Sequence, residues 1–259
     1  MRSVTVLVIP AEGDSAETEQ WYVTKLKEYY LQQECQIDVK IFEYTADLDI
    51  GRGITEQVKY YSQMLELSDF EIHAQGGLGA YVACRMMQTF RPGCIRRIFF
   101  VGGGPSPAMT WIAKFFHRYF VYLWYLLPIP FFADDPNPHH DPIIAQIRQS
   151  STSTMRANPK LYRNQLAFIG NWAKGASVSE FRQSLGGSYV LSNCPCYIVP
   201  NGKTKYLKWW NNTYSEKKLK QYWKKCGVIQ TKQPQNYFSF YSMMPAEELF
   251  QVMDQTRRL

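Results

Sequence analysis

Residues 68–83 place chemistry-bearing side chains in the most definite structural setting of this chain of 259 residues. A short apolar run ending at Ile72 predicts a strand, and small residues from Gly79 onward predict a helix that lies close on a sheet. Between them is a glycine-rich turn of five residues: His73, Ala74, Gln75, Gly76 and Gly77. Such a strand-to-helix corner is where α/β proteins expose a reactive side chain. We therefore expect the functional site at this corner.

The turn resembles the nucleophile elbow of the α/β-hydrolases, whose common pattern is Gly-His-Ser-Gln-Gly-Gly. His73, Gln75, Gly76 and Gly77 match that pattern, while Ile72 replaces its first glycine. The resemblance puts Ala74 in the nucleophile position. Sliding the frame to residues 75–79 puts Gly77 there instead. Neither frame offers a side chain that can attack a substrate.

The other catalytic positions that the resemblance implies are also substituted. The acid position after the penultimate strand holds Lys205, whose ammonium would repel an imidazolium. The region that resembles the catalytic-histidine segment, residues 237–248, contains no histidine and has Phe240 at the degenerate position. Pro10 and Ala11 replace the usual oxyanion-hole His-Gly. A laboratory Ser→Ala change would have left the acid and the histidine in place, so natural loss is the better interpretation.

The resemblance thus predicts a catalytically inactive α/β-hydrolase-fold protein, a pseudoenzyme that acts as a binding or scaffolding module for a protein partner or a small apolar ligand. Its expected pocket is lined by these residues: Glu12, Gly13, His73, Ala74, Gln75, Lys205 and Tyr241. His73 is also interpreted as a structural core histidine. The alternative is an enzyme with substituted, non-serine chemistry, a hydrolase or lyase in which Lys203, Lys205 or Glu12 transfers protons.

The order of strand and helix patterns predicts an α/β fold with a mostly parallel, doubly wound sheet. Residues 1–259 form one expected domain. Because Val4–Ile9 resembles the third strand of the full family, the two N-terminal edge strands of that fold are expected to be missing. The alternation of strand and helix patterns stops over residues 105–190, where the resemblance implies a helical lid. It resumes at Cys196, with a helix at 214–226, a strand at 236–241 and a final helix from Pro245.

Aromatic side chains gather at the start of the expected lid, among them Trp111, Phe115 and Tyr119. Charged residues break the first half of this stretch, and the remainder is shorter than the ~20 residues that a bilayer core requires. We therefore expect no transmembrane span. The stretch is interpreted as an amphipathic lid helix, and an exposed apolar face would make it a partner-binding or membrane-surface patch.

A basic segment covers residues 197–232, with nine lysines against a single acidic residue. Aromatic residues alternate with the lysines, and the candidate partner-binding residues here are Trp209, Trp210, Lys217 and Lys218. The pattern suits a solvated helix face, and it also suits an acidic protein or an anionic membrane surface. Nucleic acid is a less favoured partner, although the net charge of +7 and the pI near 9.0 permit it.

We expect no cofactor. Two further patterns bear on this, a loop with possible metal ligands and the set of cysteines. The loop at residues 134–142 holds three aspartates and two histidines, but its prolines splay neighbouring side chains, so we interpret it as a polar turn and not a metal site. Six cysteines stand in a chain whose N-terminal apolar run predicts a core strand and not a signal peptide. They are interpreted as reduced thiols of a cytoplasmic protein.

Overall fold

A six-stranded parallel sheet organises the chain, in the order β2-β1-β3-β4-β5-β6. The computed structural model describes residues 2–11, 14, 16, 19–44, 52–65, 69–90, 93–102, 157, 158, 160, 161, 165, 194–200, 226–228 and 246–257. The strands are β1 Arg2–Ile9, β2 Cys35–Ile41, β3 Phe70–Gln75, β4 Ile95–Gly102, β5 Cys196–Pro200 and β6 Cys226–Val228. The helices are α1 Gln20–Gln32, α2 Arg52–Leu65, α3 Gly76–Thr89 and α13 Ala246–Arg257.

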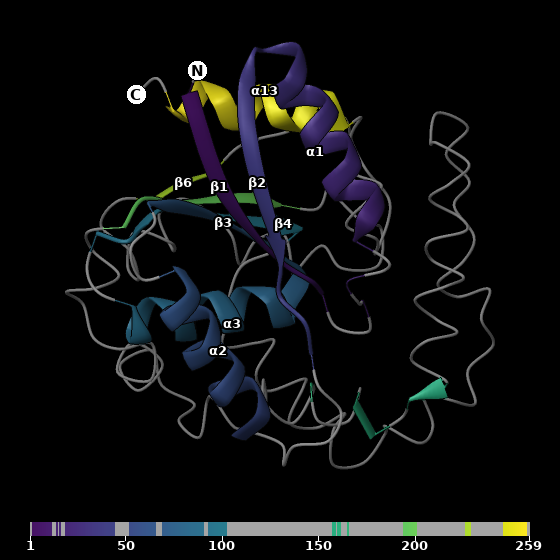
Figure 1. Ribbon diagram of the computed structural model, residues 1–259, viewed down its shortest axis with the longest axis vertical. Coiled ribbons are helices and arrows are strands. Elements are labelled where there is room, and N and C mark those ends of the chain that lie inside the picture. Colours follow the sequence, from purple (N-terminus) through teal and green to yellow (C-terminus); the bar gives the residue numbers. More distant parts are fainter. Residues whose placement is uncertain are drawn as a thin grey trace.

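Helices cover both faces of the sheet. Figure 1 shows α1 and α13 together on one side and α2 and α3 on the other. Parallel strands cannot be joined by tight turns, so a helix crosses between successive strands and lands on one face or the other. Both faces are therefore buried, which explains why β1 is apolar without interruption from Val6 to Ile9. Leu7 and Ile9 pack on the α2 and α3 side, while Val4, Val6 and Val8 pack on the α1 side.

Helix α3 lies unusually close to the sheet. A Cβ atom added at Gly79 would stand 2.8 Å from the carbonyl oxygen of Ile9 and 3.3 Å from the carbonyl carbon of Ala74. Only a residue without a side chain fits there. Ala80 and Ala83 continue the same contact surface and are fully buried. The small residues of the sequence thus set the distance between α3 and the sheet.

Tyrosine hydroxyls join α1 to the C-terminal helix. Tyr29 donates a hydrogen bond of 2.7 Å to Asp254 Oδ2, and Tyr30 donates one of 3.3 Å to Asp254 Oδ1. The ring of Phe250 packs between the two helices, 5.4 Å from the ring of Tyr29. The last helix is therefore fixed against the first, although more than 200 residues separate them in sequence.

The structure confirms the predicted α/β class and the parallel sheet with helices on both faces. One local prediction is wrong. Cys226 begins strand β6 and does not end a helix, because a short Cys-Gly-Val segment pairs with β5. Of the expected lid only five residues are described, and the expected strand at 236–241 lies outside the described residues.

Candidate functional site at the β3–α3 corner

Strand β3 runs into α3 without a connecting loop. Gln75, the last strand residue, is extended, with φ −97° and ψ 135°. The next residue, Gly76, has φ 62° and begins the helix. A positive φ is costly for residues with a side chain, and the elbow of α/β-hydrolases holds its nucleophile on such a strained turn. Gly76 therefore occupies the strained corner position.

The sequence frame that placed Ala74 at the corner is wrong by two residues. Ala74 is an interior strand residue, opposite Ile9 on one side and Phe100 on the other. Its methyl group is fully buried in the core beneath α2 and α3. The alternation of Phe70 and Ile72 with polar residues was the signal for this, since it places Ala74 in the same apolar series. Neither Ala74 nor Gly76 carries a nucleophilic atom.

The second face of β3 carries a row of polar side chains. Glu71, His73 and Gln75 alternate with the apolar set, and each is at most 1% exposed. They point to the side covered by α1 and α13. The prediction that His73, Ala74 and Gln75 line one pocket is therefore wrong. The strand directs Ala74 to one face of the sheet and His73 and Gln75 to the opposite face. All three side chains are closed off from solvent.

Each polar residue of this row has a partner on a neighbouring element. The Arg97 Nε lies 3.2 Å from Glu71 Oε1. The Tyr22 hydroxyl lies 2.9 Å from Nδ1 of His73. The Gln75 amide donates a hydrogen bond of 2.8 Å to a carboxylate oxygen of Glu19, a residue that is itself fully buried. We name these six residues the buried polar row: Glu19, Tyr22, Glu71, His73, Gln75 and Arg97.

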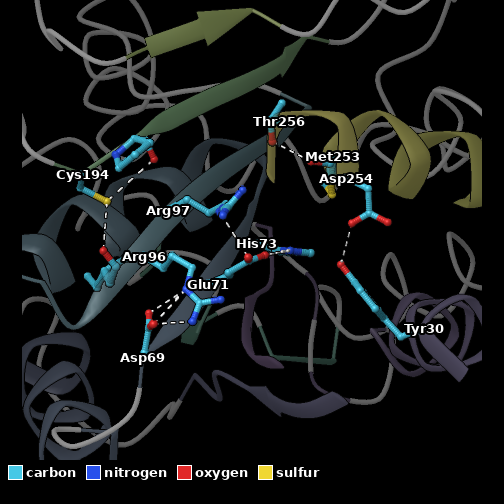
Figure 2. A network of polar contacts seen from close by, with 12 residues as sticks. Tyr30, Asp69, Glu71, His73, Arg96, Arg97, Cys194, Met253, Asp254 and Thr256 are labelled. Carbon is cyan, nitrogen blue, oxygen red and sulfur yellow. Dashed lines mark hydrogen bonds and ion pairs between the residues drawn. The ribbon is translucent and has the colours of Figure 1, made fainter. Parts of the chain in front are cut away.

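His73 is the centre of the row, as Figure 2 shows for its side next to Glu71 and Arg97. Its Nε2 atom lies 3.9 Å from Glu71 Oε2, which is too long for a hydrogen bond. Its ring meets the rings of Tyr22 and Phe99 edge on, with centroid separations of 6.1 Å and 5.3 Å. Packed in this way, His73 links α1 to the sheet. The sequence interpretation did not include Tyr22, the partner of His73, or Arg97, the partner of Glu71.

An extra residue in β4 places Arg97 opposite Glu71, within the buried polar row. Phe70 pairs with Ile95, but Glu71 pairs with Arg97, so Arg96 is the additional residue of a bulge. Arg96 turns to the surface, where its Nε donates to the two carboxylate oxygens of Asp69 at 2.9 Å and 3.0 Å. A second guanidinium nitrogen of Arg96 donates to Oδ2 of the same residue. These hydrogen bonds raise the pKa of Arg96. Without the bulge Arg96 would stand opposite Glu71, and Arg97 would face the apolar side.

Several predicted site residues lie outside the described part of the chain, namely Glu12, Gly13, Trp111, Phe115, Tyr119, Lys205, Trp209, Trp210, Lys217, Lys218, Phe240 and Tyr241. The loop at residues 134–142 lies outside it as well. Among the described residues no three His, Cys, Asp or Glu side chains are arranged to hold a metal ion. No helix in the described ranges is long and apolar enough to cross a membrane. Among the described residues, these cysteines are free thiols: Cys35, Cys84, Cys94, Cys194 and Cys196.

Solved structures with the same arrangement of sheet and helices identify the fold. The juvenile hormone epoxide hydrolase of the silkworm Bombyx mori matches with a TM-score of 0.58 and 12% identity, covering 100% of this chain and 70% of the other. An extracellular α/β-hydrolase from a Paenibacillus species matches with a TM-score of 0.54 and 14% identity over 97% and 98% of the two chains. The chain has the α/β-hydrolase fold.

A third solved structure matches nearly the whole chain. It is an AqdC variant, described with the recognition and ring-cleavage of the Pseudomonas quinolone signal, with a TM-score of 0.58 and 9% identity over 98% of this chain and 92% of the other. Identities this low establish the fold alone. No protein-family model and no curated protein matches the sequence.

Proposed function

We propose that this α/β-hydrolase-fold protein is a non-catalytic binding or scaffolding module. The observation that carries the proposal is the identity of the corner residue. The position with the strained backbone is Gly76, and its strand neighbour Ala74 is buried, so the corner has no hydroxyl, thiol or carboxylate to form a covalent intermediate. The substitutions at Lys205 and Phe240 support the same proposal from sequence.

The buried polar row does not supply a substitute. A catalytic acid or base must come within hydrogen-bonding distance of the group that it protonates or deprotonates. His73 and Glu71 are enclosed between the sheet and α1, with exposures of 0% and 1%. Their role is to hold the layers together, and the function proposed here uses that rigid fold as a support for partner recognition.

The experiment is turnover of a panel of short and long acyl esters, together with labelling by a serine-directed fluorophosphonate. We expect neither turnover nor labelling. The matched control is Gly76→Ser, which places a hydroxyl at the strained corner. This variant should also stay inactive, because the acid and histidine positions remain substituted. Turnover by the wild-type protein would refute the proposal, and activity in the variant alone would show that an acid–base pair survives elsewhere in the chain.

The second candidate is an enzyme with non-serine chemistry. It is favoured by the enzymes among the structural matches, which include epoxide hydrolases and a ring-cleaving protein. Under this proposal Lys203, Lys205 or Glu12 would transfer protons near the corner. Epoxide and heterocycle substrates should then be consumed by the wild-type protein and not by Lys205→Met or Glu12→Gln. Lack of consumption by the wild-type protein would exclude this candidate for those substrates.

A further inference from the structure

Strand β2 ends the sheet with its outer side free of any described strand. The sheet order places β2 beside β1 alone. An edge strand with unpaired N–H and C=O groups is a template for pairing with a further strand. The groups at this edge therefore decide what partner can dock there.

The backbone phase of β2 follows from its neighbours. The N–H of Phe42 donates to the Val8 carbonyl of β1, so the residues in phase with it, Lys40 and Asp38, also turn their backbone groups toward β1. The alternate residues Ile37, Val39 and Ile41 turn theirs outward. In agreement with this, the Ile41 carbonyl accepts a hydrogen bond of 2.7 Å from the Tyr61 hydroxyl of α2 instead of one from β1.

The side chains of β2 divide in the same way. Ile37, Val39 and Ile41 are half-buried against the core beneath α1. Asp38 and Lys40 lie on the opposite face, and their side chains are 55% and 42% exposed. Their charged groups are 3.5 Å apart within one strand, an exposed pair that contributes little to stability.

We propose that this edge pairs with the same edge of a second copy of the chain, as an antiparallel ladder centred on Val39. In that register Val39 faces Val39 of the second copy, and each Ile37 faces an Ile41. Each Asp38 then faces a Lys40 across a two-fold axis, at the closely spaced, non-hydrogen-bonded positions. Two opposite-charge pairs form, and Ile37, Val39 and Ile41 of both copies make one continuous apolar face.

The charges select this register over its neighbours. Shifting the centre to position 38 would set Asp38 against Asp38, and like charges directly opposite one another destabilise a ladder. A centre at position 37 would set Asp38 against the neutral Gln36 and would leave Lys40 opposite only Glu34, which precedes β2 and has a φ of 53°. The Tyr61 hydroxyl limits the ladder at one end, and the Ile41 carbonyl still has a second lone pair with which to accept a bond. The charges that discourage random edge pairing thus favour one specific pair.

The test is sedimentation equilibrium of the wild-type protein and three charge variants. The wild-type protein should dimerise reversibly with concentration. Lys40→Asp and Asp38→Lys should each raise the dimer dissociation constant by about tenfold or more, because they set like charges opposite one another twice. The double variant Asp38→Lys with Lys40→Asp restores both pairs and should return the constant to near that of the wild type. A wild-type protein that stays monomeric, or single variants that dimerise as well as the wild type, would overturn the proposal.

A cysteine pair measures the register. Residues that face each other in a hydrogen-bonded pair have Cα atoms about 5.5 Å apart, within the range of a disulfide. In a Cys35→Ser background, Val39→Cys should oxidise to a covalent dimer, whereas Ile37→Cys should not, because its counterpart lies several residues away. Crosslinking of the second variant instead of the first would show a different register. Equal unfolding midpoints across all variants check that each one folds.

Discussion

The two faces of β3 fix the same strand to the helices around it by different physical means. One face is apolar, and its residues are Phe70, Ile72 and Ala74. The other face carries the central residues of the buried polar row, which are Glu71, His73 and Gln75. An apolar contact loses stability in proportion to the volume removed. A buried polar contact depends on its partner, since removing one member leaves the other with its desolvation cost. The comparison predicts that damage on the apolar face is local and that damage on the polar face can be repaired by a second substitution.

The largest effect is expected on the apolar face. Phe70 is fully buried against Phe90, with ring centroids 5.1 Å apart. Phe70→Ala should lower the free energy of unfolding by about 4 kcal/mol, from lost burial and the cavity left behind. Denaturant unfolding measures this, and Phe70→Leu should recover most of the loss because it refills the space. A loss below about 1 kcal/mol for the alanine variant would show that this face is not tightly packed.

The next effect tests the dependence of partners on the polar face. Arg97→Leu should cost about 3 kcal/mol, because Glu71 stays buried without its arginine. The double variant Arg97→Leu with Glu71→Leu should recover a large part of that loss. Denaturant unfolding of the single and the double variant measures the two free energies. If the double variant is less stable than the single one, Glu71 contributes more through its other contacts than through Arg97, and the comparison fails.

A smaller effect is expected from the link between α1 and His73. Tyr22→Phe removes the hydroxyl that meets His73 Nδ1 at 2.9 Å and keeps the ring, at a cost of about 1–2 kcal/mol. Tyr30→Phe is the matched control. Its hydroxyl reaches Asp254 at 3.3 Å, where Tyr29 already donates, so its loss should cost no more than about 0.5 kcal/mol. If the two variants lose the same free energy of unfolding, the buried hydrogen bond of Tyr22 contributes no more than the half-buried one of Tyr30.

The smallest effect is a pH dependence on the apolar side of the sheet. Burial of the Cys84 thiol raises its pKa, and the nearby Cys194 thiol acts in the same direction. The folded state then keeps the proton at a pH where the unfolded chain releases it. The free energy of unfolding should therefore fall as the pH rises past the unfolded thiol pKa, about 8.5, by at most about 1.4 kcal/mol per pH unit.

Cys84→Ala should remove that alkaline slope. Unfolding curves of the wild type and the variant at about pH 8 and pH 10 measure it. Cys94→Ala, which removes a half-buried thiol before β4, is the control. An unchanged slope in Cys84→Ala would assign the alkaline loss to other groups.

The sheet and its helices were predictable because their signals are local. Val4–Ile9 is a run of apolar residues interrupted only by Thr5, and the small residues Gly79, Ala80 and Ala83 indicate a helix packed closely on a sheet. The short strand β6 gave no such signal, since its three residues depend on pairing with β5.

The site was only partly predictable, for a different reason. That a glycine-rich corner follows β3 could be read from sequence, but which residue takes the positive φ depends on where β3 stops pairing with its neighbours. The partners of the buried polar side chains were not predictable from sequence either. Tyr22, the partner of His73, lies 51 positions away in sequence, and the pairing of Glu71 with Arg97 and not with Arg96 depends on a one-residue bulge.

The order of the strands also shapes how the chain assembles. Strand β1 joins β2 and β3 within the first 75 residues, and β4 follows 20 positions later, so four adjacent strands can form while the chain is still short. Strand β5 must then return from beyond position 190 to pair with β4, and closing so long a loop is slow compared with local contacts. During synthesis the outer edge of β4 therefore stays open until β5 has been made. An incomplete chain would therefore contact chaperones or other incomplete copies at the outer edge of β4.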